Sequence, residues 1–203
     1  MNEHVVLTEK NEKKLELIDD KKYKVLVYYP KTEYKILNIE ISKMINNYID
    51  DFKNEVNKKD IKNQYFYLNI LYDEYKYKNY ISYIFHIESF LGEIHPKHSI
   101  WTINYNTDSK KIVDMDCLLL NNPNILYDLS TYTRKILKDN KKITNYSLMI
   151  SGTSPKKSNY ERFAFDKKGI IIFFEIYQVA PYSSGEFVIT VPYGEVDKLN
   201  IIC

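Results

Sequence analysis

The sequence predicts an α+β fold, an antiparallel β-sheet with two amphipathic helices packed on one face. Segments of alternating apolar, β-branched and aromatic residues follow one another, and we expect hairpins rather than crossovers to connect the strands. Two further segments repeat apolar residues every three or four positions. We expect residues 1–22 to form a charged, flexible N-terminal lead and residues 23–203 to form one domain, because no repeat or low-complexity linker divides them.

The first strand and the first helix have clear patterns. Residues 23–31, YKVLVYYPK, alternate and then reach Pro30, which predicts a strand. From Asn38 onward the apolar positions have helical spacing, with Asn38 as the expected N-cap and Glu40 in the first turn. The stripe expected to face the core consists of Ile41, Met44, Ile45, Tyr48, Phe52 and Val56.

The middle of the chain predicts two pairs of strands. Residues 65–91 contain two long alternating runs that are joined near residues 76–79, with tyrosines on alternate positions of both. Residues 98–106 and 111–119 flank the segment Thr107-Asp108-Ser109-Lys110, whose composition is typical of a tight turn. We therefore expect a further hairpin there.

A second helix is expected to begin with Asn122 as its cap and Pro123 at its first position, and to end near Asp139. Its apolar stripe consists of Ile125, Leu129, Tyr132, Ile136 and Leu137. Residues 146–150 then predict a short strand, and residues 151–159 a loop that offers no core.

The C-terminal part predicts three more strands. Two of them lie within residues 160–179, and the turn between them ends at Gly169, which is expected to take the positive φ of a bulged turn. The run 170–174 is apolar on both faces, as is typical of a central strand. The segment Ala-Pro-Tyr-Ser-Ser-Gly follows as a hairpin tip, and a strand over residues 186–193 and a short acidic helical turn come after it.

The composition argues against several classes of protein. The 203 residues are 44% hydrophobic and 28% charged, which is ordinary for a globular domain. The chain has 29 Lys and Arg against 27 Asp and Glu, and its lysines are scattered among carboxylates, so no nucleic-acid partner is expected. No apolar run approaches the roughly 18 to 20 residues that span a bilayer.

The sequence gives little information on the cellular compartment of the protein. The N-terminus has no apolar core of the kind a signal peptide requires, which by itself indicates the cytoplasm, but a chain whose anchor had been removed would look the same. Cys117 and Cys203 do not form a framework that sets the compartment. Cys117 lies in an apolar run and is expected to be an inert core cysteine.

Cues for catalysis and metal binding are few. His95 and His98, with Glu93 beside them, could be drawn as metal ligands, but catalytic zinc needs three protein ligands and an open position, so a surface loop is favoured. Asp114 and Asp116 would point the same way on a strand, a spacing too common to indicate acid–base catalysis. We predict no enzyme, no catalytic residues, no metal and no cofactor.

Exposed aromatic residues are the remaining candidates for function. The chain has 20 tyrosines, and the amino-acid usage of an AT-rich genome explains much of this excess. Tyrosine and tryptophan still supply large, rigid contact area with a polar group, as protein interfaces and sugar platforms require. Trp101, Tyr177 and Tyr182 are the candidates, with core packing favoured for Trp101.

The C-terminal half resembles a bacterial extracytoplasmic domain family. The residues that carry the resemblance are Gly169 with the apolar run after it, Tyr177-Gln-Val-Ala-Pro-Tyr, Gly185, and Val191-Pro192-Tyr193 with Glu195. The family occurs in RsiV-type anti-sigma factors and in the non-catalytic N-terminal region of PdaC-type peptidoglycan deacetylases. Similar matches at residues 23–31, 45–52 and 81–99 extend the resemblance to about residues 23–200.

The resemblance implies a binding function. In RsiV the domain binds lysozyme outside the cell, and binding permits proteolysis of the anti-sigma factor and release of its sigma factor. The predicted partner-binding residues are Tyr177, Pro181, Tyr182, Ser183, Gly185, His95 and Pro96. Three carboxylates would offer complementary charge to a basic lysozyme: Glu93, Glu175 and Glu186. One departure is the sequence Gly92-Glu93-Ile94-His95, where the family usually has Gly-Gly-Ala-His.

The resulting prediction is a non-enzymatic, lysozyme-binding ectodomain of an RsiV-like anti-sigma factor that controls an ECF sigma factor. We expect it outside the cytoplasm, at the cell surface, and held at the membrane only through a segment absent from this chain. The alternative is a peptidoglycan-binding accessory domain, free-standing or part of a polysaccharide deacetylase. An enzyme with an unrecognised site is the third hypothesis.

Overall fold

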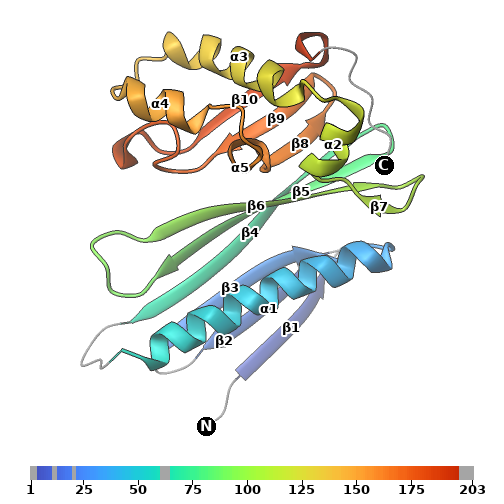
Figure 1. Cartoon of the computed structure of the whole chain (residues 1–203). Coiled ribbons are helices and arrows are strands. Elements are labelled where there is room, and N and C mark those ends of the chain that lie inside the picture. Colours follow the sequence, from blue (N-terminus) through green and yellow to red (C-terminus); the bar gives the residue numbers. More distant parts are fainter. Residues whose placement is uncertain (1–3, 11–12, 20–21, 60–64, 197–203) are drawn as a thin grey trace. The chain divides into compact units, whose positions relative to one another are not determined.

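The computed structural model of the chain describes residues 4–10, 13–19, 22–59 and 65–196. The chain divides into two compact units: unit 1 comprises residues 1–73 and 85–99, and unit 2 comprises residues 74–84 and 100–203. Both units contain helices and strands with mostly antiparallel pairing, which confirms the α+β class (Figure 1). Strands β4, β5 and β6 contribute residues to both units.

Unit 1 begins with three antiparallel strands. β1 (His4–Lys10) pairs with β2 (Lys13–Asp19), and β2 pairs with β3 (Tyr23–Pro30). The N-terminal lead, which was expected to be flexible, therefore contains two strands. The cause is not local: β3 buries alternate side chains such as Val25 and Val27, and its backbone groups on one edge find their partners in β2.

Helix α1 (Lys35–Asn57) packs its apolar stripe against β3. Its buried residues are Leu37, Ile41, Met44, Ile45, Ile49, Phe52 and Val56. The helix begins before the expected cap, so Asn38 lies inside its first turn. There the Asn38 side chain accepts hydrogen bonds from the amide and the hydroxyl of Thr32 (3.1 and 2.8 Å) and donates one to the Thr32 carbonyl (2.7 Å). Asn38 thus fixes the segment that enters the helix rather than capping it.

The strands that follow α1 agree with the first predicted hairpin. β4 (Phe66–Tyr77) lies parallel to β3, from the Tyr23–Phe66 pair to the Val27–Ile70 pair. The expectation of hairpins alone is therefore wrong here, because α1 is a crossover connection between two parallel strands. A two-residue turn at Lys78 and Asn79 leads into β5 (Tyr80–Phe90). Lys78 has a φ of 52°, the left-handed backbone that tight hairpins need.

The second predicted hairpin is only partly confirmed. β6 (Lys97–Asn106) pairs with β7 (Lys111–Ile112), which ends after two residues. The strand predicted over residues 111–119 is therefore wrong beyond Ile112, and α2 (Met115–Asn121) takes its place. The cause is a cap: the carboxylate of Asp114 accepts a hydrogen bond from the Cys117 amide at 2.9 Å, which stabilises the first turn of the helix.

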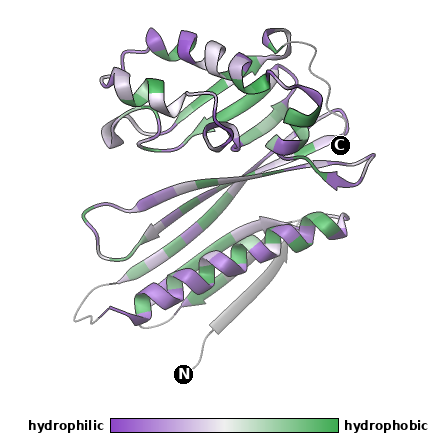
Figure 2. Cartoon of the chain, in the orientation of Figure 1, coloured by the Kyte–Doolittle hydropathy of each residue, from purple (hydrophilic) through white to green (hydrophobic). Residues whose placement is uncertain are grey.

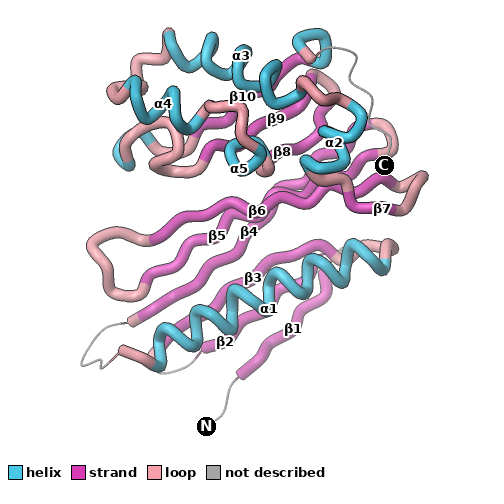
Figure 3. The backbone as a smooth tube through the Cα atoms, viewed as in Figure 1, coloured by secondary structure: helices cyan, strands magenta, loops and turns pink. Residues whose placement is uncertain are grey.

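The C-terminal half of unit 2 is a three-stranded antiparallel sheet covered by helices. The strand order is β10 (Phe187–Pro192), β9 (Gly169–Phe174), β8 (Phe163–Asp166), and every residue of β9 is buried, which confirms the predicted central strand. Figures 1 and 3 show α3 (Ile125–Lys138) and α4 (Tyr146–Gly152) on one face of this sheet. Figure 2 shows that these three strands are largely hydrophobic. Short helices are α5 (Lys157–Tyr160), η1 (Tyr182–Ser184) and η2 (Tyr193–Glu195).

Helices α3 and α4 differ from the sequence predictions at their starts. α3 begins at Ile125 with Asn124 at its cap position, two residues later than expected, and it ends before Asp139 as predicted. Residues 146–150 form part of α4 and not a strand, because the Asn145 side chain accepts a hydrogen bond from the Leu148 amide at 3.0 Å and caps the helix.

Gly169 is required by close packing and not by its backbone angles. The glycines with positive φ among the described residues are Gly92 and Gly185, so the predicted left-handed conformation at Gly169 is wrong. A Cβ at Gly169 would lie 2.0 Å from the carbonyl oxygen of Val191 on the neighbouring strand β10. Any side chain at this position would push β9 and β10 apart.

Candidate binding surface

Residues 175–186, which connect β9 to β10 in unit 2, form the contact loop. The loop is not the simple hairpin tip that the sequence predicts. It folds back on unit 2, because Val179 and Ala180 in its middle are buried in the core beside β9 and β10. The exposed residues of the loop therefore lie on a segment that packs against unit 2 and not on a protruding hairpin.

The loop opens with a turn that carries Tyr177 in a strained conformation. The Gln178 amide donates a hydrogen bond to the Glu175 carbonyl at 3.0 Å, which closes a four-residue turn with Tyr177 at its third position. Tyr177 has a φ of 70°. This left-handed conformation is the one that a type II turn requires at its third position, where glycine or asparagine is usual. Tyr177 is 61% exposed.

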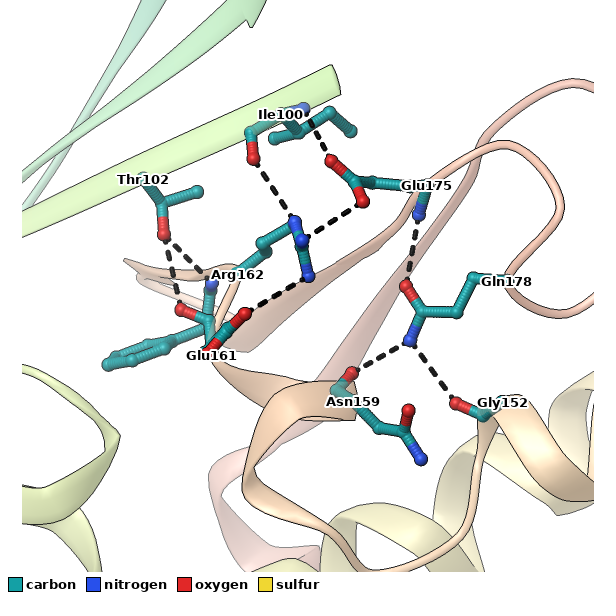
Figure 4. Close-up of polar contacts among 9 residues, drawn as sticks. Ile100, Thr102, Gly152, Asn159, Glu161, Arg162, Glu175 and Gln178 are labelled. Atoms are coloured by element: carbon teal, nitrogen blue, oxygen red, sulfur yellow. Dashed lines mark hydrogen bonds and ion pairs between the residues drawn. The ribbon is translucent and has the colours of Figure 1, made fainter. Parts of the chain in front are cut away.

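Gln178 holds this turn to the rest of unit 2 (Figure 4). Its side-chain oxygen accepts a hydrogen bond from the Glu175 amide at 3.2 Å. Its side-chain nitrogen donates to the carbonyl of Gly152 at 3.2 Å and to that of Asn159 at 3.0 Å. One amide side chain thus ties the start of the contact loop to the end of α4 and to α5.

Glu175 and Arg162 fix the other side of the turn. The Glu175 carboxylate accepts a hydrogen bond from the Ile100 amide at 2.8 Å and pairs with the Arg162 guanidinium at 2.9 Å. Arg162 also donates from Nε to the Ile100 carbonyl at 3.1 Å. All of these contacts lie within unit 2 and are drawn in Figure 4. Glu175 is therefore an anchor of the loop, and its charge is already matched.

The second half of the contact loop is ordered by its own hydrogen bonds. The amides of Ser184 and Gly185 donate to the carbonyls of Pro181 and Tyr182 at 2.9 and 3.0 Å, which forms the η1 turn. Gly185 then takes a φ of 74° as the chain enters β10. The Ser184 hydroxyl donates to the Lys142 carbonyl at 2.9 Å, which ties the turn to the segment before α4.

Tyr177 and Tyr182 form an aromatic pair at the surface. Their ring centroids are 5.6 Å apart and the ring planes are inclined by 45°. Tyr182 and Pro181 are half-buried, and Ser183 is exposed. The pair offers two adjoining aromatic faces, one of them mostly open to solvent, on a backbone that hydrogen bonds hold at both ends.

Helix α4 is held equally firmly against α3. Arg134 of α3 donates to the Ile150 carbonyl at 2.9 Å and to the Thr153 hydroxyl at 3.0 Å. The Thr153 carbonyl accepts from the hydroxyls of Ser130 at 2.6 Å and Tyr160 at 2.8 Å. Burial raises the pKa of Tyr160, so its phenol stays protonated and keeps donating at alkaline pH as well. The loop residues Gly152 and Thr153, expected to offer no core, are buried in this cluster.

Residues 118–194 match the family described as "Protein of unknown function (DUF3298)". This range includes α4 and the whole contact loop. Over 174 residues the chain is 27% identical to the peptidoglycan-N-acetylmuramic acid deacetylase PdaC of Bacillus subtilis (strain 168). That alignment covers 83% of this chain but 37% of PdaC, so the chain spans well under half of that relative.

Two solved structures have a similar fold. A DUF3298 family protein from Pseudomonas aeruginosa PAO1 has a TM-score of 0.61 at 11% identity, with 96% of this chain and 91% of the other covered. A member of the same family from Bacteroides fragilis has a TM-score of 0.51 at 15% identity, with 97% and 92% covered. At these identities the likeness shows the fold alone.

The predicted contact residues fall into two groups. Five of them, Tyr177, Pro181, Tyr182, Ser183 and Gly185, lie together in the contact loop of unit 2. His95, which is exposed, and Pro96, which is half-buried, belong to unit 1.

The other sequence candidates have structural partners. Glu93 forms an ion pair with Lys97 at 3.5 Å and accepts a hydrogen bond from the Leu91 amide at 3.0 Å. Asp116, in the first turn of α2, pairs with Lys157. Trp101 is half-buried in β6. Among the residues that the structure describes, no group of three or more His, Cys, Asp or Glu side chains is placed to hold a metal ion.

Cys117 differs from the expectation of an inert core cysteine. It is half-buried and disulfide-bonded. Cys203, the other cysteine of the sequence, lies outside the described residues. Within the described ranges, no helix is both long enough and apolar enough to cross a membrane.

Sequence reasoning missed the exposed face of α4. Tyr146 is 56% exposed and Ile150 is 37% exposed, and their spacing of four residues puts them on one side of the helix. The signal was present in the sequence as Asn145, a strong N-cap residue directly before an apolar run.

Proposed function

We propose that this chain is a non-enzymatic binding module of the bacterial cell envelope that holds its partner at the contact loop. The observation that carries the proposal is Tyr177, an exposed aromatic residue in a left-handed conformation that glycine would adopt more easily. Backbone strain of this kind concentrates at functional positions. The Tyr177 ring is exposed, so core packing does not account for a bulky side chain at this place.

The partner that we favour is peptidoglycan. Adjoining tyrosine faces suit the apolar faces of sugar rings, and their hydroxyl groups can bond to sugar hydroxyls. The relative PdaC is named for its action on N-acetylmuramic acid in peptidoglycan. A domain shared with such an enzyme would serve to keep it on its polymer, and the present chain would bind the same polymer by itself or beside further domains.

A location outside the cytoplasm fits this function. PdaC is named for a cell-wall substrate, and the resemblance described above is to extracytoplasmic domains. The disulfide at Cys117 agrees, since disulfides persist in oxidising compartments and are rare in the cytosol.

The second candidate function is lysozyme sensing, as in RsiV-type anti-sigma factors. The Ala-Pro-Tyr-x-x-Gly element favours it, because Pro181 and Tyr182 sit on an ordered turn that can bind a protein at small entropic cost. The expected acidic complement to a basic lysozyme has less support: Glu175 is matched by Arg162, and Glu93 by Lys97. An anti-sigma role also requires a sigma-binding segment beyond these 203 residues.

Sedimentation with purified peptidoglycan sacculi tests the proposal. The chain should pellet with sacculi, and Tyr177→Ala should weaken binding by about tenfold, the loss of one aromatic anchor. Tyr127→Ala is the matched control, because Tyr127 is 65% exposed on α3 and lies outside the contact loop. If the wild type does not bind sacculi but gives a calorimetric signal on titration with lysozyme, lysozyme sensing replaces peptidoglycan binding as the proposed function. Absence of both would overturn the proposal.

A further inference from the structure

The contact loop and α4 run side by side and form one surface. Near one end the Ser184 hydroxyl bonds to the Lys142 carbonyl at 2.9 Å, just before α4 begins. At the other end the Gln178 side chain bonds to the Gly152 carbonyl at 3.2 Å, at the last residue of α4. A Cβ on Gly152 would lie 1.8 Å from the Gln178 carbonyl oxygen, so no side chain separates helix and loop there. The two elements are therefore fixed to each other at both ends.

Helix α4 carries a second set of exposed apolar groups. Tyr146 and Ile150 lie on one face of α4, while Tyr177 and Tyr182 lie on the adjoining loop. The helix is seven residues long, and at about 1.5 Å per residue it spans roughly 10 Å. That length is enough for two sugar rings in a chain, so the α4 face can extend a binding site that begins at the Tyr177–Tyr182 pair.

The segment that leads into α4 is positively charged. Residues 138–142, Lys-Asp-Asn-Lys-Lys, carry three lysines and one aspartate, a net +2. Lys141 and Lys142 are exposed, and within the described part of the chain neither ammonium group forms an ion pair. The turn that carries them is ordered, because the Asn140 side chain accepts a hydrogen bond from the Lys142 amide at 2.9 Å. Such a cation pair attracts an anionic ligand and disfavours a basic protein.

We infer that Lys141, Lys142 and Tyr146 extend the contact loop into a site for a carboxylate-bearing glycan, the chemistry of peptidoglycan with its stem-peptide carboxylates. The aromatic residues contact sugar rings, and the two lysines pair with carboxylates of the glycan chain. The inference rests on the proposed function, since it specifies the ligand of the same loop.

The test uses the full chain and sacculi stripped of phosphate polymers. Lys141→Gln with Lys142→Gln should weaken binding about tenfold at low salt, and the difference should shrink at high salt because exposed ion pairs are screened. Lys167→Gln with Lys168→Gln, in the exposed turn between β8 and β9, is the matched control and should bind like the wild type. Tyr146→Ala should also weaken binding, whereas Tyr127→Ala should not.

Neutralised sacculi complete the test. Amidation of the sacculus carboxylates should weaken wild-type binding as much as the double lysine variant does, and it should not weaken that variant further. Equal binding of native and amidated sacculi would overturn the inference, as would binding that requires the phosphate polymers. If Tyr177→Ala loses binding while the lysine variant and Tyr146→Ala match their controls, the inference fails and the proposed function stands. If the wild type does not bind sacculi at all, the proposed function fails.

Discussion

Replacing Tyr177 separates the energetic cost of its backbone conformation from the contribution of its side chain to binding. The left-handed conformation, with a φ of 70°, costs a non-glycine residue about 1–2 kcal/mol. Glycine removes this cost but adds about 0.5–1 kcal/mol of chain entropy to the unfolded state. Both variants lose the contact between the Tyr177 and Tyr182 rings, so this loss cancels in the comparison. Tyr177→Gly should therefore be about 0.5–1 kcal/mol more stable than Tyr177→Ala.

Urea unfolding followed by circular dichroism measures this difference, with position 127 as the control. Tyr127 is also exposed but lies within α3, where glycine should be about 0.5–1 kcal/mol less stable than alanine. The two positions thus predict opposite signs for the same pair of substitutions. Both substitutions at Tyr177 should weaken partner binding by about tenfold, although the glycine variant is the more stable. A glycine variant at position 177 that is less stable than the alanine variant would refute the argument from strain.

Three further predictions concern the scaffold. Gln178→Ala removes three hydrogen bonds of the contact loop and should lower the free energy of unfolding in urea by about 2–3 kcal/mol. Amide hydrogen exchange in residues 175–186 should become faster. Unchanged exchange would contradict the anchoring role of Gln178. Gly169→Ala should cost at least about 3 kcal/mol, because the new Cβ meets the Val191 carbonyl; a thermal midpoint within 2 °C of wild type would contradict this. Burial raises the pKa values of Tyr160 and Tyr193 in the folded protein, so the unfolded state loses these protons first and stability should fall as the pH rises above about 10. Tyr193→Phe with Tyr160→Phe should flatten that fall in thermal unfolding across alkaline pH, and an unchanged slope would count against it.

Elements with strong local periodicity were predictable from the sequence. The alternation in β3, β4 and β5, and the continuous apolar run of β9, follow directly from how sheets bury one or both faces. The failures at residues 111–119 and 146–150 share one cause. A short apolar run fits a helix or a strand equally well, and the decision came from the caps at Asp114 and Asn145.

Other features depend on partners that are distant in the chain. Strands β1 and β2 form because β3 offers an edge, which the charged N-terminal sequence does not reveal by itself. Tyr177 and Tyr182 were predicted as contact residues from their sequence, but the attachment of the contact loop to the segment before α4 depends on bonds such as that from Ser184 to Lys142. Likewise, the left-handed backbone of Tyr177 has no sequence signal, because the position lacks the glycine that usually marks it.

An NMR titration locates the bound partner on the chain. Soluble peptidoglycan fragments that keep their carboxylates would be added to the isotope-labelled chain, and amide shifts would be followed residue by residue. The predicted result is a set of saturating shifts confined to residues 141–150 and 175–186. Shifts centred on the His95–Pro96 loop, or no shifts at millimolar fragment concentrations, would contradict the proposal that the contact loop and α4 bind a cell-wall glycan.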